Sequence, residues 1–130
     1  MASPDIAIAP LPADLAAPRG HYSHAVRAAG LVFVAGELPV APDGRLLTDA
    51  SFEEQARQVL ANVEAALRSA GSSVHKLVQV RVYVTDIDQW PAFNALYAQW
   101  CGPARPARIV VPVPRLHYGF QLEMEATALA

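Results

Sequence analysis

Hydrophobic residues recur at helical spacing between residues 51 and 71. The stripe consists of Phe52, Ala56, Val59, Leu60, Val63, Leu67 and Ala70. Ser51 and Glu54 form a capping-box pair, and Gly71 stands where a helix C-cap glycine belongs. The pattern predicts an amphipathic helix of about five turns that packs on a sheet. The polar residues of the opposite face are expected to be solvated: Glu53, Gln55, Arg57, Asn62, Glu64 and Arg68.

A second helical stripe is aromatic. It contains Trp90, Phe93, Leu96 or Tyr97, and Trp100. Asp88 is placed to cap this helix, and Pro91 falls inside its first turn, where proline is tolerated. We expect these aromatic side chains to pack in the core rather than to bind a cofactor.

Several other segments read as β-strands, because apolar residues alternate there or run continuously between turn residues. They span residues 22–27, 31–36, 45–47, 77–85, 106–113 and 120–130. In the segment 77–85, the residues Val78, Val80, Val82 and Val84 share one face, which we assign to the helices. Pro112 and Pro114 cannot donate ladder hydrogen bonds, so the strand 106–113 is expected at a sheet edge.

The order of these elements, β-β-(β)-α-β-α-β-β, predicts an α+β fold with a mixed β-sheet and both helices packed on one face. A chain of 130 residues fits a single domain. We assign residues 1–19, which are rich in Pro and Ala, to an extended N-terminal arm and residues 20–130 to the domain. The strand 31–36 is apolar on both faces, so it must be covered twice. With 53% hydrophobic residues overall, self-association is the simplest source of the second cover.

Charge and cysteine content exclude several classes of function. The net charge is −2 and no Lys/Arg cluster occurs, so nucleic acid binding is not expected. A single cysteine, Cys101, permits no intrachain disulfide, and the four histidines show no metal-ligand spacing. No secretory signal and no apolar run of about 18 residues is present, so we expect a cytoplasmic protein without a membrane partner.

Arg108 and Glu123 are the charges that the strand pattern leaves unexplained. Arg108 stands among apolar residues, and an arginine costs several kcal/mol to bury without a partner. We place both side chains on the sheet face away from the helices. Either they form a structural ion pair or lie in water, or Arg108 grips a carboxylate while Glu123 moves a proton or orients water. Spacing alone does not decide between these alternatives.

Several motifs together carry a family resemblance. They are "GHYSHAV", "VFVAGELPV", "EEQARQVLANVEAALRSAG", "KLVQVRVYVTDIDQWPAFNALYAQW", "PARIVV" and "LEMEATA". From about residue 17 to residue 129 the chain resembles the Rid family of imine and enamine deaminases, also called YjgF/YER057c/UK114. The arginine of "PAR" and the glutamates of the last motif are the most specific of these features.

The resemblance implies a chorismate-mutase-like fold in a homotrimer with a central barrel and with active sites between subunits. In deaminating members the arginine matching Arg108 binds the substrate carboxylate, and the glutamate matching Glu123 positions the hydrolytic water. The residues matching Tyr22, Gly36 and Asn94 line the cleft. The implied reaction converts a 2-imino acid to a 2-oxo acid and ammonia, and it requires no metal or organic cofactor.

Three residues depart from the family pattern inside this pocket. Ala35 replaces a common serine, Glu37 replaces a glutamine, and Val110 replaces a cysteine. Glu37 either pairs with a basic group of a different substrate or faces solvent. His117 and Tyr118, in the loop before the last strand, either alter the cleft or are simply exposed.

These departures keep a second function open. The first is hydrolysis of small imino or enamine carboxylates, and the alternative is a non-catalytic trimer that binds a small carboxylate or regulates another protein. A ribonuclease fits poorly with the lack of a basic groove. A holdase chaperone would need apolar surface that trimerisation should cover.

Overall fold

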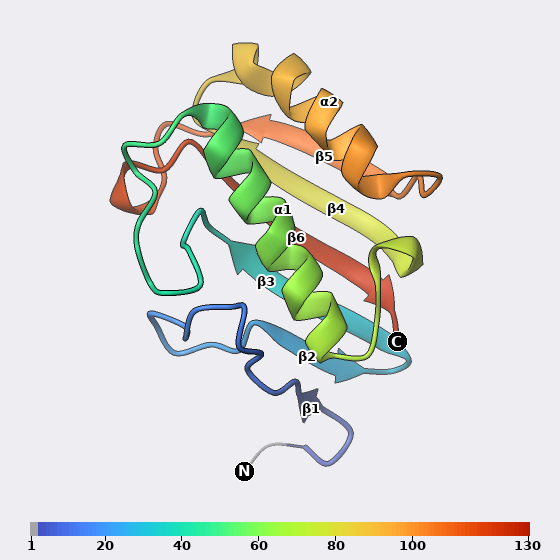
Figure 1. The fold of residues 1–130 in the computed structure, drawn as a ribbon. Coiled ribbons are helices and arrows are strands. Elements are labelled where there is room, and N and C mark those ends of the chain that lie inside the picture. The colour runs from blue at the N-terminus through green and yellow to red at the C-terminus, as the bar shows by residue number, and fades with distance from the viewer. Residues whose placement is uncertain (1–2) are drawn as a thin grey trace.

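The computed structural model describes residues 3–130, which fold into one sheet covered by two helices on one face (Figure 1). The strands are β1 (Ala7–Ile8), β2 (Ala25–Ala28), β3 (Leu31–Glu37), β4 (Leu77–Val84), β5 (Ala107–Pro112) and β6 (Leu122–Leu129), and the helices are α1 (Phe52–Ser69) and α2 (Trp90–Cys101). One-turn 3₁₀ helices are η1 (Val74–Lys76), η2 (Ile87–Gln89) and η3 (His117–Gly119). The predicted α+β architecture is confirmed.

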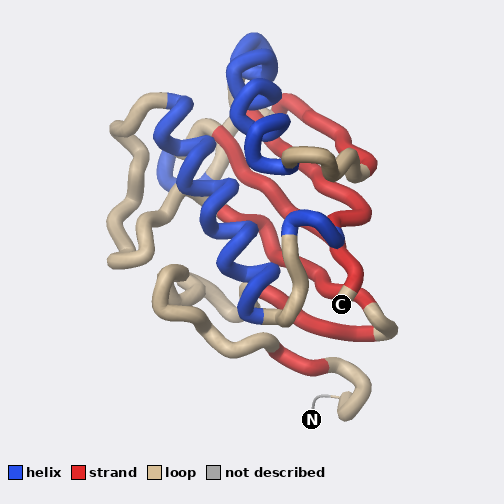
Figure 2. The backbone as a smooth tube through the Cα atoms, turned by 45° about the vertical axis from the view of Figure 1, so that its right-hand side comes forward, coloured by secondary structure: helices blue, strands red, loops and turns tan. Residues whose placement is uncertain are grey.

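The strand order is β1-β2-β3-β6-β4-β5, and β4 with β5 is the parallel pair in an otherwise antiparallel sheet. The predicted edge position of the proline-containing strand is confirmed, because β5 ends the sheet and stops at Pro112. Viewed from the side, the helices form one layer and the strands the other (Figure 2). The second sheet face has no helix over it.

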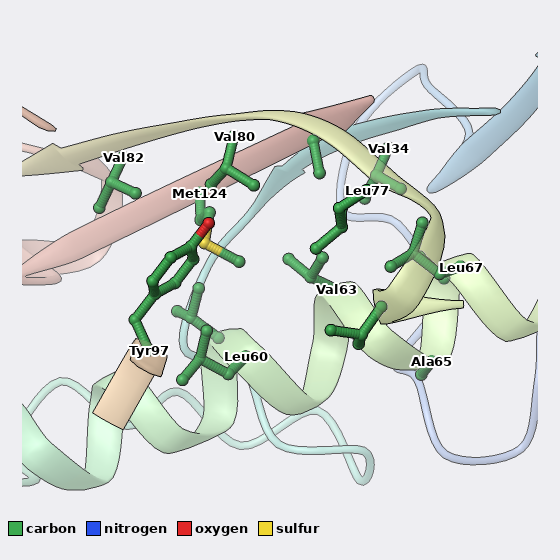
Figure 3. Close-up of a cluster of buried hydrophobic side chains, with 14 of the residues drawn as sticks. Val34, Leu60, Val63, Ala65, Leu67, Leu77, Val80, Val82, Tyr97 and Met124 are labelled. Carbon is green, nitrogen blue, oxygen red and sulfur yellow. The ribbon is translucent and has the colours of Figure 1, made fainter. Parts of the chain in front are cut away.

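Helix α1 provides most of the cover. Its stripe packs onto the middle strands, where Leu60 and Val63 lie against Val80 of β4 and Met124 of β6 (Figure 3). Val63, Val80 and Met124 are fully buried. Each such side chain contributes about 1.5–3 kcal/mol through removal from water. Ser51 Oγ accepts a hydrogen bond from the backbone N–H of Glu54 at 3.2 Å, so the predicted cap is confirmed.

The polar face of α1 is not wholly solvated, which corrects the prediction for Gln55 and Asn62. Both are buried. Gln55 donates to the carbonyls of Thr48 and Ala50 and accepts from the backbone N–H of Gln121. Such amides can be buried because loops outside the helix supply hydrogen-bond partners. Helical periodicity in the sequence does not reveal these partners.

Asn62 likewise forms hydrogen bonds to backbone carbonyls, in its case those of the loop after β3. Its amide donates to the carbonyl of Leu38 at 3.0 Å and of Val40 at 2.9 Å, and its Oδ1 accepts from Gln58. The loop 38–47 contains only an isolated bridge between Val40 and Leu46, so the short strand predicted at 45–47 is wrong. Side-chain hydrogen bonds from α1 and backbone hydrogen bonds within the loop, such as that from Ala41 to Arg45, hold this segment.

Two further local predictions need correction. The register between β4 and β6 shifts between Leu77 and Gln79, so Leu77 is buried in place of Val78, which is 46% exposed. A β-bulge of this kind interrupts strict alternation. Asp88 does not cap α2, because η2 precedes the helix and Gln89 occupies the N-cap without a side-chain bond.

The N-terminal arm runs along the sheet edge. β1 pairs with β2, Leu15 is buried in the core, and Asp14 pairs with Arg68 of α1 at 2.8 Å. No helix within residues 3–130 is long and apolar enough to cross a membrane.

Candidate functional site

The sheet register places Arg108 and Glu123 on opposite faces. Val80 of β4 pairs directly with Arg108 in the parallel register, and Val80 is buried under the helices. Tyr83 pairs with Glu123, and these two side chains share the helix-free face. The prediction that both charges lie away from the helices is therefore wrong for Arg108. Alternation shows which residues of β5 share a face, but both sets are apolar, so only the register identifies the covered face.

Helix α2 holds Arg108. Its Nη1 donates to Asn94 Oδ1 at 2.8 Å, and its guanidinium carbon lies 5.7 Å from the ring centre of Trp90 and 5.0 Å from that of Tyr97. Cation–π contacts at these distances favour the charged group. The aromatic stripe thus packs partly against this arginine, although Phe93 and Tyr97 are buried in the core as expected.

The Arg108 guanidinium has donor groups left for a ligand. Within residues 3–130 no acidic side chain forms an ion pair with it. The guanidinium borders an open cavity of about 540 Å³ together with Asn94 and Tyr97. Val110 follows on the same face and packs against the core. This group, which we call the arginine half-site, consists of Asn94, Arg108 and Val110.

Glu123 lies against Gly36 at the end of β3. A Cβ atom on Gly36 would come within 2.5 Å of Glu123 Oε2, so the absence of a side chain at 36 is what admits the carboxylate. Partial burial raises the pKa of Glu123, Glu125 adds to the rise, and His117 acts in the opposite direction. A carboxyl group with a raised pKa is a better general base than an ordinary one.

Next to Gly36 is a cavity of about 180 Å³. Its walls come from the arm, the ends of β2 and β3, α1 and the loop before β6: Leu15, Ala16, Ala17, Arg19, Gly20, Tyr22, His24, Gly36, Glu37, Leu38, Val40, Asn62, His117 and Tyr118. Tyr22, Gly36, Glu37 and Glu123 are the glutamate half-site. His117 and Tyr118 are exposed on their loop and also line this cavity.

Glu37 is buried with a partner inside the chain. Only 2% of the residue is exposed, and Oε2 lies 2.7 Å from His24 Nδ1. Burial raises the pKa of Glu37 more strongly than His24 lowers it. Burial works to lower the pKa of His24, but the contact with Glu37 outweighs it and the pKa is raised. The expectation that Glu37 faces solvent is wrong.

Sequence reasoning missed His24 and Asn62 as cavity residues. His24 was excluded as a metal ligand from its spacing, and the described part of the chain has no cluster of three His, Cys, Asp or Glu that could hold a metal ion. The signal that could have found the contact between His24 and Glu37 is the turn at residues 29–30. It brings β2 back along β3, so the residue before Ala25 lies beside the residues that follow Val34.

Comparison with known proteins identifies the family to which the chain belongs. The family model described as endoribonuclease L-PSP matches residues 13–130. A RutC family protein of Pyrococcus abyssi is 36% identical over 111 residues, which cover 85% of this chain and 87% of that protein. The chain belongs to the Rid family, also known as the YjgF/RutC or L-PSP family.

Solved Rid-family structures share the fold. YyfA of Yersinia pestis, described as a conserved Rid protein of unknown function, superposes with a TM-score of 0.91 at 31% identity and covers 96% of this chain and 99% of its own. TdcF of Escherichia coli, solved with bound serine, gives a TM-score of 0.87 at 31% identity and covers 95% and 98%.

Proposed function

We propose that this Rid-family chain hydrolyses small 2-imino or enamine acids to 2-oxo acids and ammonia. The observation that carries the proposal is Arg108, a fixed guanidinium without an ion-pair partner in residues 3–130. A guanidinium fork matches a carboxylate bidentately. The bound serine of TdcF, which carries a carboxylate beside a nitrogen-bearing carbon, agrees with such a substrate class.

Arg108 and Glu123 of one chain lie on opposite sheet faces, so we propose that the working site forms between two copies. Arg108 and Asn94 of one copy bind the substrate carboxylate, and Glu123 of a neighbour faces the imine carbon. Association in a homotrimer would also cover the helix-free sheet face, where Phe33 and Ile109 are 41% and 51% exposed.

Glu123 supplies the proton transfers. It takes a proton from water as the water oxygen bonds to the carbon of the protonated imine and the C=N π pair moves to nitrogen, which gives a neutral carbinolamine. Glu123 then gives this proton to the nitrogen. The carbon–nitrogen bond breaks with its electron pair leaving on ammonia, and Glu123 takes the hydroxyl proton as the carbonyl forms and passes it to the ammonia. A positioned carboxylate contributes about 10²- to 10⁴-fold in such steps, and fixing the substrate on Arg108 adds the benefit of orientation.

The test uses 2-iminobutanoate generated in place by an amino acid oxidase. Wild-type protein is expected to speed its disappearance, Arg108→Ala to lose about 10²-fold or more in kcat/KM, and Arg108→Lys to recover part of it. Arg57→Ala, on the exposed face of α1, is the matched control and is expected to match wild type. Equal rates for wild type and Arg108→Ala would remove the proposal.

The alternative, a small-carboxylate binder without turnover, rests on the bound serine of TdcF and on the Ala35, Glu37 and Val110 departures. Calorimetric binding of 2-oxobutanoate that depends on Arg108, together with no imine hydrolysis, would favour it. The family name also refers to ribonuclease activity. The net charge of −2 argues against RNA as the substrate, and RNA incubated with the protein is expected to stay intact.

A further inference from the structure

The cavity beside Gly36 contains a buried acceptor that the chain leaves unused. Glu37 Oε2 is 2.7 Å from His24 Nδ1, whereas Oε1 has no hydrogen-bond donor among residues 3–130. The side chain of Glu37 is only 3% exposed and lines the cavity. Oε1 is not fully enclosed, because the Tyr97 hydroxyl is the fully buried side-chain polar atom that lacks a partner in residues 3–130. A group that enters this cavity can therefore reach Oε1 and donate to it in place of water.

His24 fixes the direction of that acceptor. Its Nε2 is 2.7 Å from the carbonyl oxygen of Ala16, which can only accept, so Nε2 carries a hydrogen. The remaining proton of the pair lies between Nδ1 and Glu37 Oε2. In either position of this proton, on nitrogen or on oxygen, Oε1 has free lone pairs and no hydrogen. The edge of the Tyr22 ring also packs on the imidazole.

The other polar groups of the cavity are satisfied or exposed. Asn62, also buried, uses both its amide hydrogens and its carbonyl oxygen on Leu38, Val40 and Gln58. Arg19 is exposed and donates to the carbonyl of Gly44. Much of the remaining lining is apolar. Among the buried side chains that line this cavity, Glu37 thus has the free hydrogen-bonding atom.

Size and position suit one substrate side chain. The volume is about 180 Å³, and a cavity of about 150 Å³ holds a benzene molecule. Gly36, which contacts Glu123, forms part of the wall. The cavity therefore has room for a ligand side chain of about four non-hydrogen atoms beside Glu37, although Glu123 itself is not among the residues that line it.

We propose that Glu37, oriented by His24, is a specificity-determining residue that selects ligands whose side chain carries a hydrogen-bond donor over apolar ligands of the same shape. The substrate class is then 2-imino acids with an amide or similar N–H group in the side chain. That these ligands are substrates rests on the proposed function, whereas the preference for a hydrogen-bond donor concerns ligand binding alone. A pocket that offers a fixed partner discriminates strongly against an analogue that lacks the donor.

Three 2-oxo acids of nearly equal shape test the preference by calorimetry. The side chain of 2-oxosuccinamate can donate, that of 4-methyl-2-oxopentanoate is apolar, and that of oxaloacetate only accepts. Wild type is expected to bind 2-oxosuccinamate about 10- to 100-fold more tightly than 4-methyl-2-oxopentanoate, with oxaloacetate weakest. Glu37→Leu removes the acceptor at nearly constant side-chain size, so 2-oxosuccinamate should lose at least about 10-fold relative to 4-methyl-2-oxopentanoate.

Glu53→Leu, on the exposed face of α1, is the matched control and should keep the wild-type order. An apolar analogue that binds wild type as tightly as the amide would overturn the inference, as would an unchanged preference for the amide in Glu37→Leu or no binding of all three at millimolar concentration. If Glu37→Leu fails to fold, the wild-type order decides alone. Loss of imine hydrolysis with the binding order intact would remove the proposed function and leave this inference standing.

Discussion

At the scale of single residues, a glycine is required at position 36 by the close approach of another side chain rather than by backbone conformation. Its φ is not positive, unlike that of Gly30 at 76°, and the space beside it is taken by the Glu123 carboxylate. Only the folded structure reveals this requirement, because the two residues are 87 positions apart. Sequence reasoning proposed Glu123 from the strand pattern and Gly36 from the family resemblance, and had no physical reason for the glycine.

Gly36→Ala is expected to push the Glu123 carboxylate aside and to lower kcat/KM by about 10²-fold, since a displacement of about 1 Å can cost that much. Gly30→Ala is the contrasting variant. No atom lies near its Cβ position, so it should lower the free energy of unfolding by about 1 kcal/mol through its positive φ and keep the activity. Imine hydrolysis and urea unfolding measure the two effects, and full activity in Gly36→Ala would contradict the role given to the contact.

The pH dependence follows from the raised pKa of Glu123, whose main cause is partial burial. A base acts in its ionised form, so kcat/KM should fall as the pH drops through a value above the usual 4.5 of a glutamate. Glu125→Gln removes a like charge that helps to raise this pKa. The acid limb of the pH profile should then move to lower pH, and a shift to higher pH would contradict this electrostatic account.

At the scale of elements, the periodicity of α1 predicted its ends and its buried stripe because a helix repeats the same geometry over five turns. The strands were less predictable. Alternation in β5 separates Arg108 from Ile109, but the covered face depends on pairing with β4, a partner distant in sequence. The bulge near Val78 shows the same limit, since the pairing with β6 shifts there.

The Ser51 cap can be tested at this scale. Ser51→Ala should lower the free energy of unfolding by about 1 kcal/mol, because the N–H of Glu54 loses its acceptor. Ser73 caps η1 without a side-chain hydrogen bond, so Ser73→Ala should change stability by less than about 0.5 kcal/mol. Equal losses in the two variants, measured by urea unfolding, would show that the hydrogen bond at Ser51 adds nothing.

At the scale of the whole molecule, Arg108 and Glu123 of one chain lie on opposite faces of the sheet. Asn94 and Arg108 lie on the helix side of the sheet, and Glu123 lies on the helix-free side. The family resemblance led to the expectation of shared sites, whereas the separation of the two charges could not be predicted from one strand pattern. The proposed hydrolysis therefore requires a neighbouring copy that brings Glu123 to Arg108.

Mixing two inactive variants tests this requirement most directly. Arg108→Ala and Glu123→Gln are co-expressed with different tags, and assemblies that contain both are isolated and assayed for imine hydrolysis. If each site combines Arg108 of one copy with Glu123 of another, a mixed trimer of either composition has one intact site in three, and its activity should rise to about a third of wild type. Mixed assemblies no more active than either variant alone would contradict the shared site.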